Sequence, residues 1–343
     1  MLRKLVLMTL TALFLLVAAP AWACGGLVAP NGTINLVRTT TLAAYHDGIE
    51  HYVTSFQFAG GGAEFGSIVP LPGVPTKVER GGDWTLQRLV KEITPVERNL
   101  AFDGAAAAPA ALGVQVLLET TIDALDITVL KGGAFAIGEW AEENGFNLPP
   151  DAPEVLEFYA RRSPIFMAAR FDAAAARDRG QSIGDGTPIH LTIPTPNPWV
   201  PLRILALGRQ AGELIQADVF LLTDREPAML PKPGSTFELE RSEEANDLLM
   251  ADLRSDDGME WMPEENMWLS YLRFDTEAGK LTHDLALDVT GADQPNPVAA
   301  GLPVSARVEP LPQLGWFLVG GGLLSVAFAL TLLATRRLTP ASP

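Results

Sequence analysis

Two of the four histidines lie close enough along the chain to serve one metal ion. In the stretch "TTTLAAYHDGIEHYVTSFQFAG", Asp47-Gly48 is a favoured two-residue hairpin turn, and its flanks are rich in Thr, Tyr, Val and Phe. This turn places His46 and His51 on the same face of the hairpin, diagonally across from each other. Asp47 or Glu50 would have to complete a metal site, but Glu50 points to the opposite face in this register. The hairpin is a candidate metal site, and a solvated polar face is the alternative.

Acidic residues also gather on two glycine-containing segments that a hard cation such as calcium would suit. They are "DRGQSIGDG" (178–186) and "SDDGMEWMPEEN" (255–266), where Asp256 and Asp257 are adjacent. Neither segment has the D-x-[DN]-x-[DN]-G spacing of a calcium loop. Solvated loops are therefore the alternative, and no other cofactor is predicted.

The sequence carries few of the strong catalytic patterns. One cysteine excludes a CxxC pair, and neither HExxH nor SxxK occurs. GxSxG occurs once, as "GQSIG" at 180–184, but a strand-like segment follows it and not the helix that a nucleophile elbow requires. A carboxylate pair for glycoside hydrolysis has no sequence signature, because its diagnostic feature is a separation in space. These observations favour a non-catalytic binding protein over the alternative, a hydrolase with an unrecognised carboxylate or serine site.

The N-terminal residues 1–23 have the pattern of a signal peptide. Two positive charges precede an apolar run, and small residues stand at the two positions that a signal peptidase inspects, Ala21 and Ala23. Trp22 and the lack of Leu three residues before Cys24 argue against a lipobox. We therefore predict cleavage between Ala23 and Cys24.

A second apolar run, residues 314–334, is long enough for a membrane helix. Trp316 lies near its outer end, and Arg336 and Arg337 follow it, which places the tail 335–343 in the cytoplasm. The sequence predicts a single-pass type I protein of the cell membrane whose large middle segment is extracytoplasmic. Gly321, Ser325 and Ala329 form a small-residue face through which two such helices would form a homodimer.

Between these ends we predict an ectodomain over 24–290 and a proline-rich stalk over 291–313. The ectodomain is one domain or two lobes, with a boundary near the alanine-rich residues 103–112. "LPQLG" before the membrane helix resembles the LPxTG sorting signal, so covalent linkage to the cell wall is the alternative to a retained helix.

The segment between the signal and the membrane helix is strongly acidic. Four of the 25 Lys and Arg lie in the two ends while all 41 Asp and Glu lie in between, which gives 21 − 41 = −20. Such a charge repels phosphate backbones, so nucleic acid is excluded as a partner, and a cation, a basic surface or another envelope component is favoured.

Hydrophobic periodicity predicts an α+β fold with a mixed, mostly antiparallel sheet and several helices. Helices are expected in "DWTLQRLVKEIT", capped by Asp83, at 136–143, after Asp151 with a capping box, and at 243–254. Strands are expected in the hairpin above and in the segments "EFGSIVP", "GVQVLLETTIDALDITVLKGG", "PIFMAARFD", "TPIHLTIPTP", "PLRILALG", "LIQADVFLLT" and "NMWLSYLRFD".

Several of these stretches resemble a known family. "ACGG", "HYVTSFQFAGGGAEFGSIVPLPGVP", "ITVLKGGAFAIGEWAEENGFNLP", "VLEFYARRSPIFMAARFD" and "IHLTIPTPNPWVPLRI" are similar to the bacterial exported family of domain of unknown function 2330. The resemblance implies export and a C-terminal membrane helix. It implies no activity and no catalytic residue.

Overall fold

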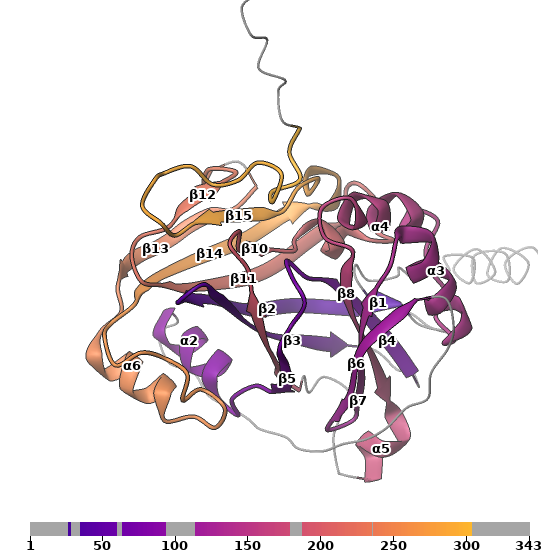
Figure 1. Cartoon of the computed structure of the whole chain (residues 1–343), viewed down its shortest axis with the longest axis horizontal. Helices are drawn as coiled ribbons and strands as arrows, with labels where there is room; N and C mark the ends of the chain where they lie inside the picture. Colours follow the sequence, from indigo (N-terminus) through magenta and orange to yellow (C-terminus); the bar gives the residue numbers. More distant parts are fainter. Residues whose placement is uncertain are drawn as a thin grey trace, which may run out of the picture. The chain divides into compact units, whose positions relative to one another are not determined.

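A seven-stranded sheet lies at the centre of the protein (Figure 1). The computed structural model describes residues 27–28, 35–59, 64–93, 114–178, 187–234 and 236–303. The strand order is β13-β14-β11-β2-β3-β9-β5, and every neighbouring pair is antiparallel except β11 with β2. The strands are β2 (Asn35–His46), β3 (Ile49–Ala59), β5 (Lys77–Arg80), β9 (Ile189–Pro194), β11 (Leu214–Thr223), β13 (Glu238–Glu244) and β14 (Trp268–Glu277).

Two smaller antiparallel sheets accompany it. The five-stranded sheet runs β1 (Leu27–Val28), β4 (Glu64–Pro70), β8 (Ile165–Asp172), β7 (Leu125–Lys131) and β6 (Gln115–Ile122). The three-stranded sheet runs β10 (Trp199–Val200), β15 (Leu285–Asp288) and β12 (Ala228–Leu230). The predicted α+β fold with mostly antiparallel strands is confirmed.

Helices lie on both sides of these sheets. In Figure 1, α2 (Thr85–Ile93) and α6 (Asp247–Arg254) lie together at one end, while α3 (Ala134–Glu143) and α4 (Ala152–Ala160) lie together at the other. The remaining described helices are α5 (Ala173–Asp178) and the 3₁₀ turns η1 (Arg203–Ala206) and η2 (Ala278–Lys280).

The central sheet is buried on both faces, and strand alternation divides its side chains between two cores. In β2 and β3, Ala43 and Tyr52 enter the larger core, whereas Leu42 and Val53 enter the second core with α2 and α6. Successive side chains of a strand point to opposite faces, so a strand covered on both sides needs apolar residues at most positions. The same division holds along β11.

A buried ion pair fastens the C-terminal part of this unit to α4. The Asp284 carboxylate is fully buried and pairs with the Arg162 guanidinium. It also accepts hydrogen bonds from Tyr159 Oη at 2.9 Å and from the backbone N–H groups of Leu202 at 2.7 Å and Arg203 at 2.8 Å. One carboxylate therefore joins α4, η1 and the segment before β15.

Arg162 also binds the last described residues of this unit. Arg162 Nη1 donates to Ala299 O at 2.9 Å, and the guanidinium carbon lies 4.2 Å from the centre of the Phe158 ring and 4.7 Å from that of Trp199. Ala299 and Ala300 are buried. The described residues up to Leu302 belong to one compact unit. The predicted domain limits, with two lobes as the alternative and a stalk from residue 291, stay a prediction.

Other expectations on the elements need correction. "PLRILALG" contains the 3₁₀ turn η1 and not a strand. The backbone N–H groups of Leu202 and Arg203 in this segment donate to the Asp284 carboxylate. Residues 238–244 form the strand β13, so α6 begins only after Asn246, whose side chain accepts from Leu249 N at 2.9 Å. The Asp151 carboxylate makes no cap on α4 and accepts instead from Gly208 N at 3.0 Å.

Removing the Asp284 carboxylate should destabilise the protein strongly. Asp284→Ala leaves the Arg162 charge buried without a partner, which typically costs about 3–5 kcal/mol. Urea denaturation of the two proteins measures this loss. Asp275→Ala, on an exposed position of β14, is the matched control. Equal midpoints for the two variants would contradict the role given to Asp284.

Candidate functional site

The two hairpin histidines share a face, as predicted, but their rings have different partners. The register pairs His46 with Ile49. His46 Nδ1 lies 2.7 Å from Asp224 Oδ1, and its Nε2 lies 3.5 Å from Asp47 Oδ2. His51 Nδ1 instead lies 3.0 Å from His190 Nε2 on the neighbouring strand β9.

His51 belongs to a row of polar side chains that crosses three strands. Glu79 on β5 is paired directly with His190, and His51 on β3 lies diagonally from His190 across the β3–β9 pair. His190 Nδ1 lies 3.4 Å from Glu79 Oε1. The row therefore runs from Glu79 through His190 to His51, with the two imidazoles 1% and 7% exposed.

Burial dominates the protonation of the two imidazoles. Burial lowers the pKa of His51 to about 3, with smaller contributions from His190, His46 and Lys77. Burial and then Lys77 lower the pKa of His190 to about 4. Both rings are neutral at pH 7.

The loop 255–266 covers this row, and we call it the covering loop. Its Trp261 ring stacks on His51 with the ring centres 3.6 Å apart and the planes at 4°. Arg254 Nη1 closes the loop by donating to Pro263 O at 2.6 Å and to Glu264 O at 2.9 Å. Met259 and Met262, which precede and follow Trp261 in the sequence, are buried.

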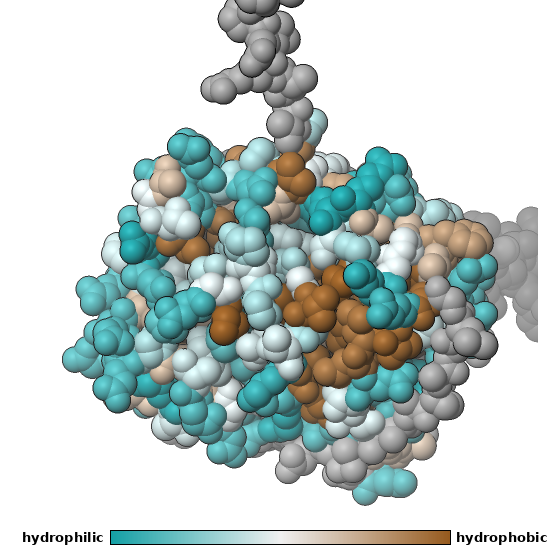
Figure 2. Space-filling model, viewed as in Figure 1, coloured by the Kyte–Doolittle hydropathy of each residue, from teal (hydrophilic) through white to brown (hydrophobic). Residues whose placement is uncertain are grey.

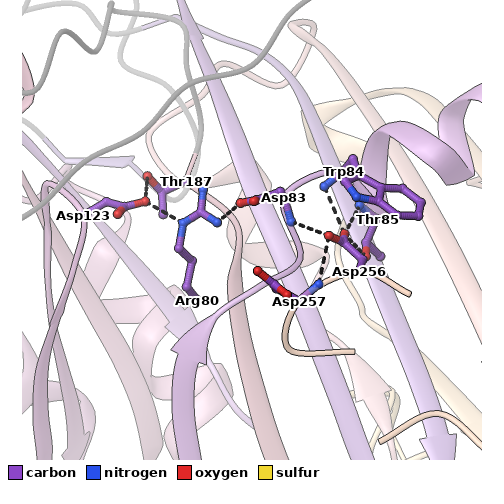
Figure 3. A network of polar contacts seen from close by, with 8 residues as sticks. All are labelled: Arg80, Asp83, Trp84, Thr85, Asp123, Thr187, Asp256 and Asp257. Carbon is purple, nitrogen blue, oxygen red and sulfur yellow. Dashed lines mark hydrogen bonds and ion pairs between the residues drawn. The ribbon is translucent and has the colours of Figure 1, made fainter. Parts of the chain in front are cut away.

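Asp256 anchors the start of the covering loop by capping α2 (Figure 3). Its carboxylate accepts from the backbone N–H groups of Asp83 at 3.0 Å, Trp84 at 3.0 Å and Thr85 at 2.7 Å, and from Thr85 Oγ1 at 2.7 Å. A carboxylate there also complements the positive end of the helix dipole. The expected cap, Asp83, pairs through its side chain with Arg80 instead, so that expectation was wrong.

The neighbouring Asp257 has a different environment. It is exposed, and in Figure 3 its side chain points away from Asp256. Among the residues that the structure describes, no three His, Cys, Asp or Glu side chains gather to hold a metal ion. The calcium site at Asp256 and Asp257 stays a prediction, and the contacts of Asp256 explain its burial without a cation.

Arg80 extends the same network toward the five-stranded sheet. Its Nε donates to Asp123 Oδ2 at 2.9 Å, and Thr187 Oγ1 donates to the same oxygen at 3.3 Å (Figure 3). Asp123 occupies the turn between β6 and β7 with a φ of 57°. The network therefore joins β5, an edge strand of the seven-stranded sheet, to the turn after β6, an edge strand of the five-stranded sheet.

Glu50, which the sequence suggested as a further ligand for the hairpin metal site, is a buried acid. It is 1% exposed on the face opposite His51, as the hairpin register predicted. Its Oε2 accepts from Trp199 N at 3.2 Å, while its buried Oε1 has no hydrogen-bond partner among the described residues. Burial raises the pKa of Glu50 to about 8, and the hydrogen bond from Trp199 lowers it by less. The carboxyl group is therefore mostly protonated at pH 7.

A small cavity lies between the sheets near Tyr52. It has a volume of about 20 Å³ and is bordered by Thr39, Thr41, Ile68 and Val219 among others. A cavity of about this volume holds one water molecule, and the hydroxyl of Thr39 is buried without a described partner. This space fits no organic substrate.

Several predicted features lie outside the described residues. They are the signal peptide and its cleavage site at Ala23 and Cys24, the loop 103–112, the membrane helix 314–334 with Trp316, Arg336 and Arg337, and the small-residue face of Gly321, Ser325 and Ala329. In the part of the chain that is described, no helix has the length and apolar character needed to cross a membrane.

Comparison with known proteins places the chain in a family. Residues 18–226 match the profile of a family described as "Uncharacterized protein conserved in bacteria (DUF2330)". The chain belongs to this family. No curated protein matches it.

Two solved structures share weak similarity with this member of the DUF2330 family. The crystal structure of baculovirus P35 is 8% identical, with a TM-score of 0.41, over 75% of this chain and 97% of that one. A mutated baculovirus P35 after caspase cleavage is 8% identical, with a TM-score of 0.38, over 73% and 99%. Both likenesses are too weak to bear on function.

Loss of the Asp256 carboxylate should cost more than loss of its neighbour. Asp256→Ala leaves several donors at the start of α2 without an acceptor, for an expected cost of about 2 kcal/mol or more. The adjacent Asp257→Ala removes an exposed carboxylate and should change the stability by less than about 0.5 kcal/mol. Chemical denaturation compares the two, and similar losses would contradict the capping role.

Glu50→Gln should change how stability depends on pH. The folded-state pKa of Glu50 is about 8 against a reference value of 4.5, so its contribution is complete below pH 4.5 and is lost as the pH rises through 8. Glutamine cannot ionise, so the variant should gain on the parent by about 1.4 kcal/mol per pH unit within this window. Denaturation midpoints from pH 4 to 9 measure the difference. Glu244→Gln, on the exposed edge of β13, is the control, and parallel profiles for parent and Glu50→Gln would refute the shift.

Proposed function

We propose that this protein is a membrane-anchored domain of the bacterial cell envelope that binds a positively charged partner and has no catalytic activity of its own. The signal pattern at 1–23 and the apolar run at 314–334 support export and anchoring. The dense negative charge of one surface is the observation that carries the binding role.

Much of the negative charge of the chain lies in residues 224–266, whose exposed side we call the acidic face. The segment contains 13 Asp and Glu and 4 Lys and Arg, so its net charge is 4 − 13 = −9, of −16 for the whole chain. In Figure 1, β13 and α6 of this segment lie on one side of the protein, and Figure 2 shows hydrophilic residues along that side. A surface of one sign attracts and orients partners of the opposite sign.

An exposed leucine stands within the acidic face. Leu248 on α6 is 67% exposed and lies next to Asp247 and one turn from Asp252. An apolar side chain inside a charged rim is the usual composition of a protein interface. The expected partner is therefore a basic protein segment with an apolar residue that contacts Leu248.

The buried carboxylates favour binding over the alternative, an envelope hydrolase. Asp256 and Asp284 each accept several hydrogen bonds, and Asp218 accepts one from Tyr271 Oη at 2.7 Å. A carboxylate held in this way stabilises the fold and is not free to take up a proton from a substrate.

A photo-cross-linking residue at position 248 of the full-length protein tests the proposal in cells. We expect a discrete adduct that stays with the membranes through high-salt washes and is released by detergent. The adduct should weaken when Asp247→Asn is added, because this change reduces the charge beside Leu248.

The same cross-linker at Phe135, which is 78% exposed on α3, is the matched control. Equal adducts from both positions, or none from position 248, would contradict binding at the acidic face. A majority that resists detergent and is freed by wall-cleaving enzymes would contradict the membrane anchor and favour the sorting signal.

A further inference from the structure

The row beneath the covering loop has the arrangement of a metal site with soft ligands. We propose that the imidazoles of His51 and His190, together with the thioethers of Met259 and Met262, bind a monovalent d¹⁰ cation of the copper(I) class. This site is independent of the anchoring and of the partner bound at the acidic face.

The two imidazoles already have the spacing that a shared ion requires. His51 Nδ1 and His190 Nε2 face each other at 3.0 Å. Two nitrogen ligands at about 2.0–2.1 Å from one metal ion lie about 3.0–3.4 Å apart when they bind at right or tetrahedral angles. The ion would replace the hydrogen bond between the rings after a small separation of β3 and β9 side chains.

Glu79 favours the tautomer that this exchange needs. His190 Nδ1 makes no hydrogen bond among the described residues, but it lies 3.4 Å from Glu79 Oε1, and a proton on Nδ1 leaves a lone pair on His190 Nε2. The bridging proton of His51 moves from Nδ1 to Nε2 on binding, so both facing nitrogens donate to the ion and no proton is lost. Glu79 then acts as an outer carboxylate that orients a metal-binding histidine.

The covering loop carries two methionines that belong to the same core as Val53, the β3 residue paired with His190. Met259 and Met262 are 0% and 4% exposed, and they flank Trp261, whose ring stacks on His51. Four of the chain's eight methionines lie in this second core: Met250, Met259, Met262 and Met267. Thioether sulfur is a soft ligand that selects copper(I) over harder cations.

Trp261 suits a cation at this position for two reasons. Its indole covers His51 and limits the access of water, which protects a reduced ion. The face of an indole also attracts a cation electrostatically. The absence of a group of three His, Cys, Asp or Glu donors among the described residues is consistent with this site, because two of its donors are methionines.

Silver(I) is the probe, because it has the same charge and d¹⁰ configuration as copper(I) and does not change oxidation state under these conditions. The full-length protein with Cys24→Ser in detergent and chloride-free buffer is titrated by calorimetry, since the Cys24 thiol would bind silver itself. We expect one silver ion per chain and quenching of tryptophan fluorescence that is absent in Trp261→Phe.

Two sets of variants locate the site. His51→Gln and His190→Gln should each weaken silver binding at least tenfold, whereas His283→Gln should not. Met259→Leu with Met262→Leu keeps the side-chain volume and should also weaken binding at least tenfold, whereas Met250→Leu with Met267→Leu, in the same core, should not.

Circular dichroism checks that each variant is folded. If a histidine variant does not fold, the Met259→Leu with Met262→Leu variant still tests the proposal. Failure of the parent to bind silver would overturn the proposal. Unchanged affinity in the folded histidine variants or in the Met259/Met262 variant would do so as well, as would displacement of silver by a tenfold excess of zinc.

Discussion

Burial of the seven-stranded sheet on both faces is the constraint on which the rest of the structure depends. Each polar side chain in its central strands enters one of two apolar cores, where an unpaired group is costly. Glu50 and His51 are adjacent in β3 and enter opposite cores. Burial keeps Glu50 protonated and His51 unprotonated, so each core holds its titratable group in the uncharged form.

These two groups set opposite limits on stability. The depressed pKa values of His51 and His190 make their contribution complete above pH 6.5, and it is lost as the pH falls through 4 and 3. Glu50 acts in the other direction, because its contribution is lost as the pH rises toward 8. From the central sheet alone, the folded state is most stable on the weakly acidic side of neutrality.

Local features of the sequence predicted local features of the fold. Asp47-Gly48 predicted the hairpin and its register because a two-residue turn fixes which residues pair, and the structure confirms both. The hydrogen-bond donors to Asp83 and Asp151 were predicted wrongly for the opposite reason. The α2 N-terminus is capped by Asp256, which lies 171 residues from Thr85, and no short-range pattern encodes such a partner.

The candidate site shows the same division. His51 was identified from its hairpin, but its partner His190 is 139 residues away and stood alone in the sequence. Nothing in the sequence distinguishes Trp261 and its flanking methionines from ordinary core residues. The contact that distinguishes Trp261, its stack on His51, depends on the position of the covering loop. The pairing of β3 with β9, which no local pattern reveals, is what creates the site.

The covering loop links the acidic face to the buried histidines, because it is part of both. Its carboxylates belong to the segment whose net charge is −9, while its Trp261 ring stacks on His51 and its two methionines are buried. A concentration of negative charge raises the local concentration of cations at the surface, and this effect depends little on the kind of cation. Selection must therefore come from the ligands beneath the loop, where neutral nitrogen and thioether sulfur discriminate against calcium and magnesium, which prefer oxygen. The acidic face would then supply attraction without specificity, and the covering loop would supply specificity, at the cost of moving Trp261 from its stack on His51 each time an ion enters.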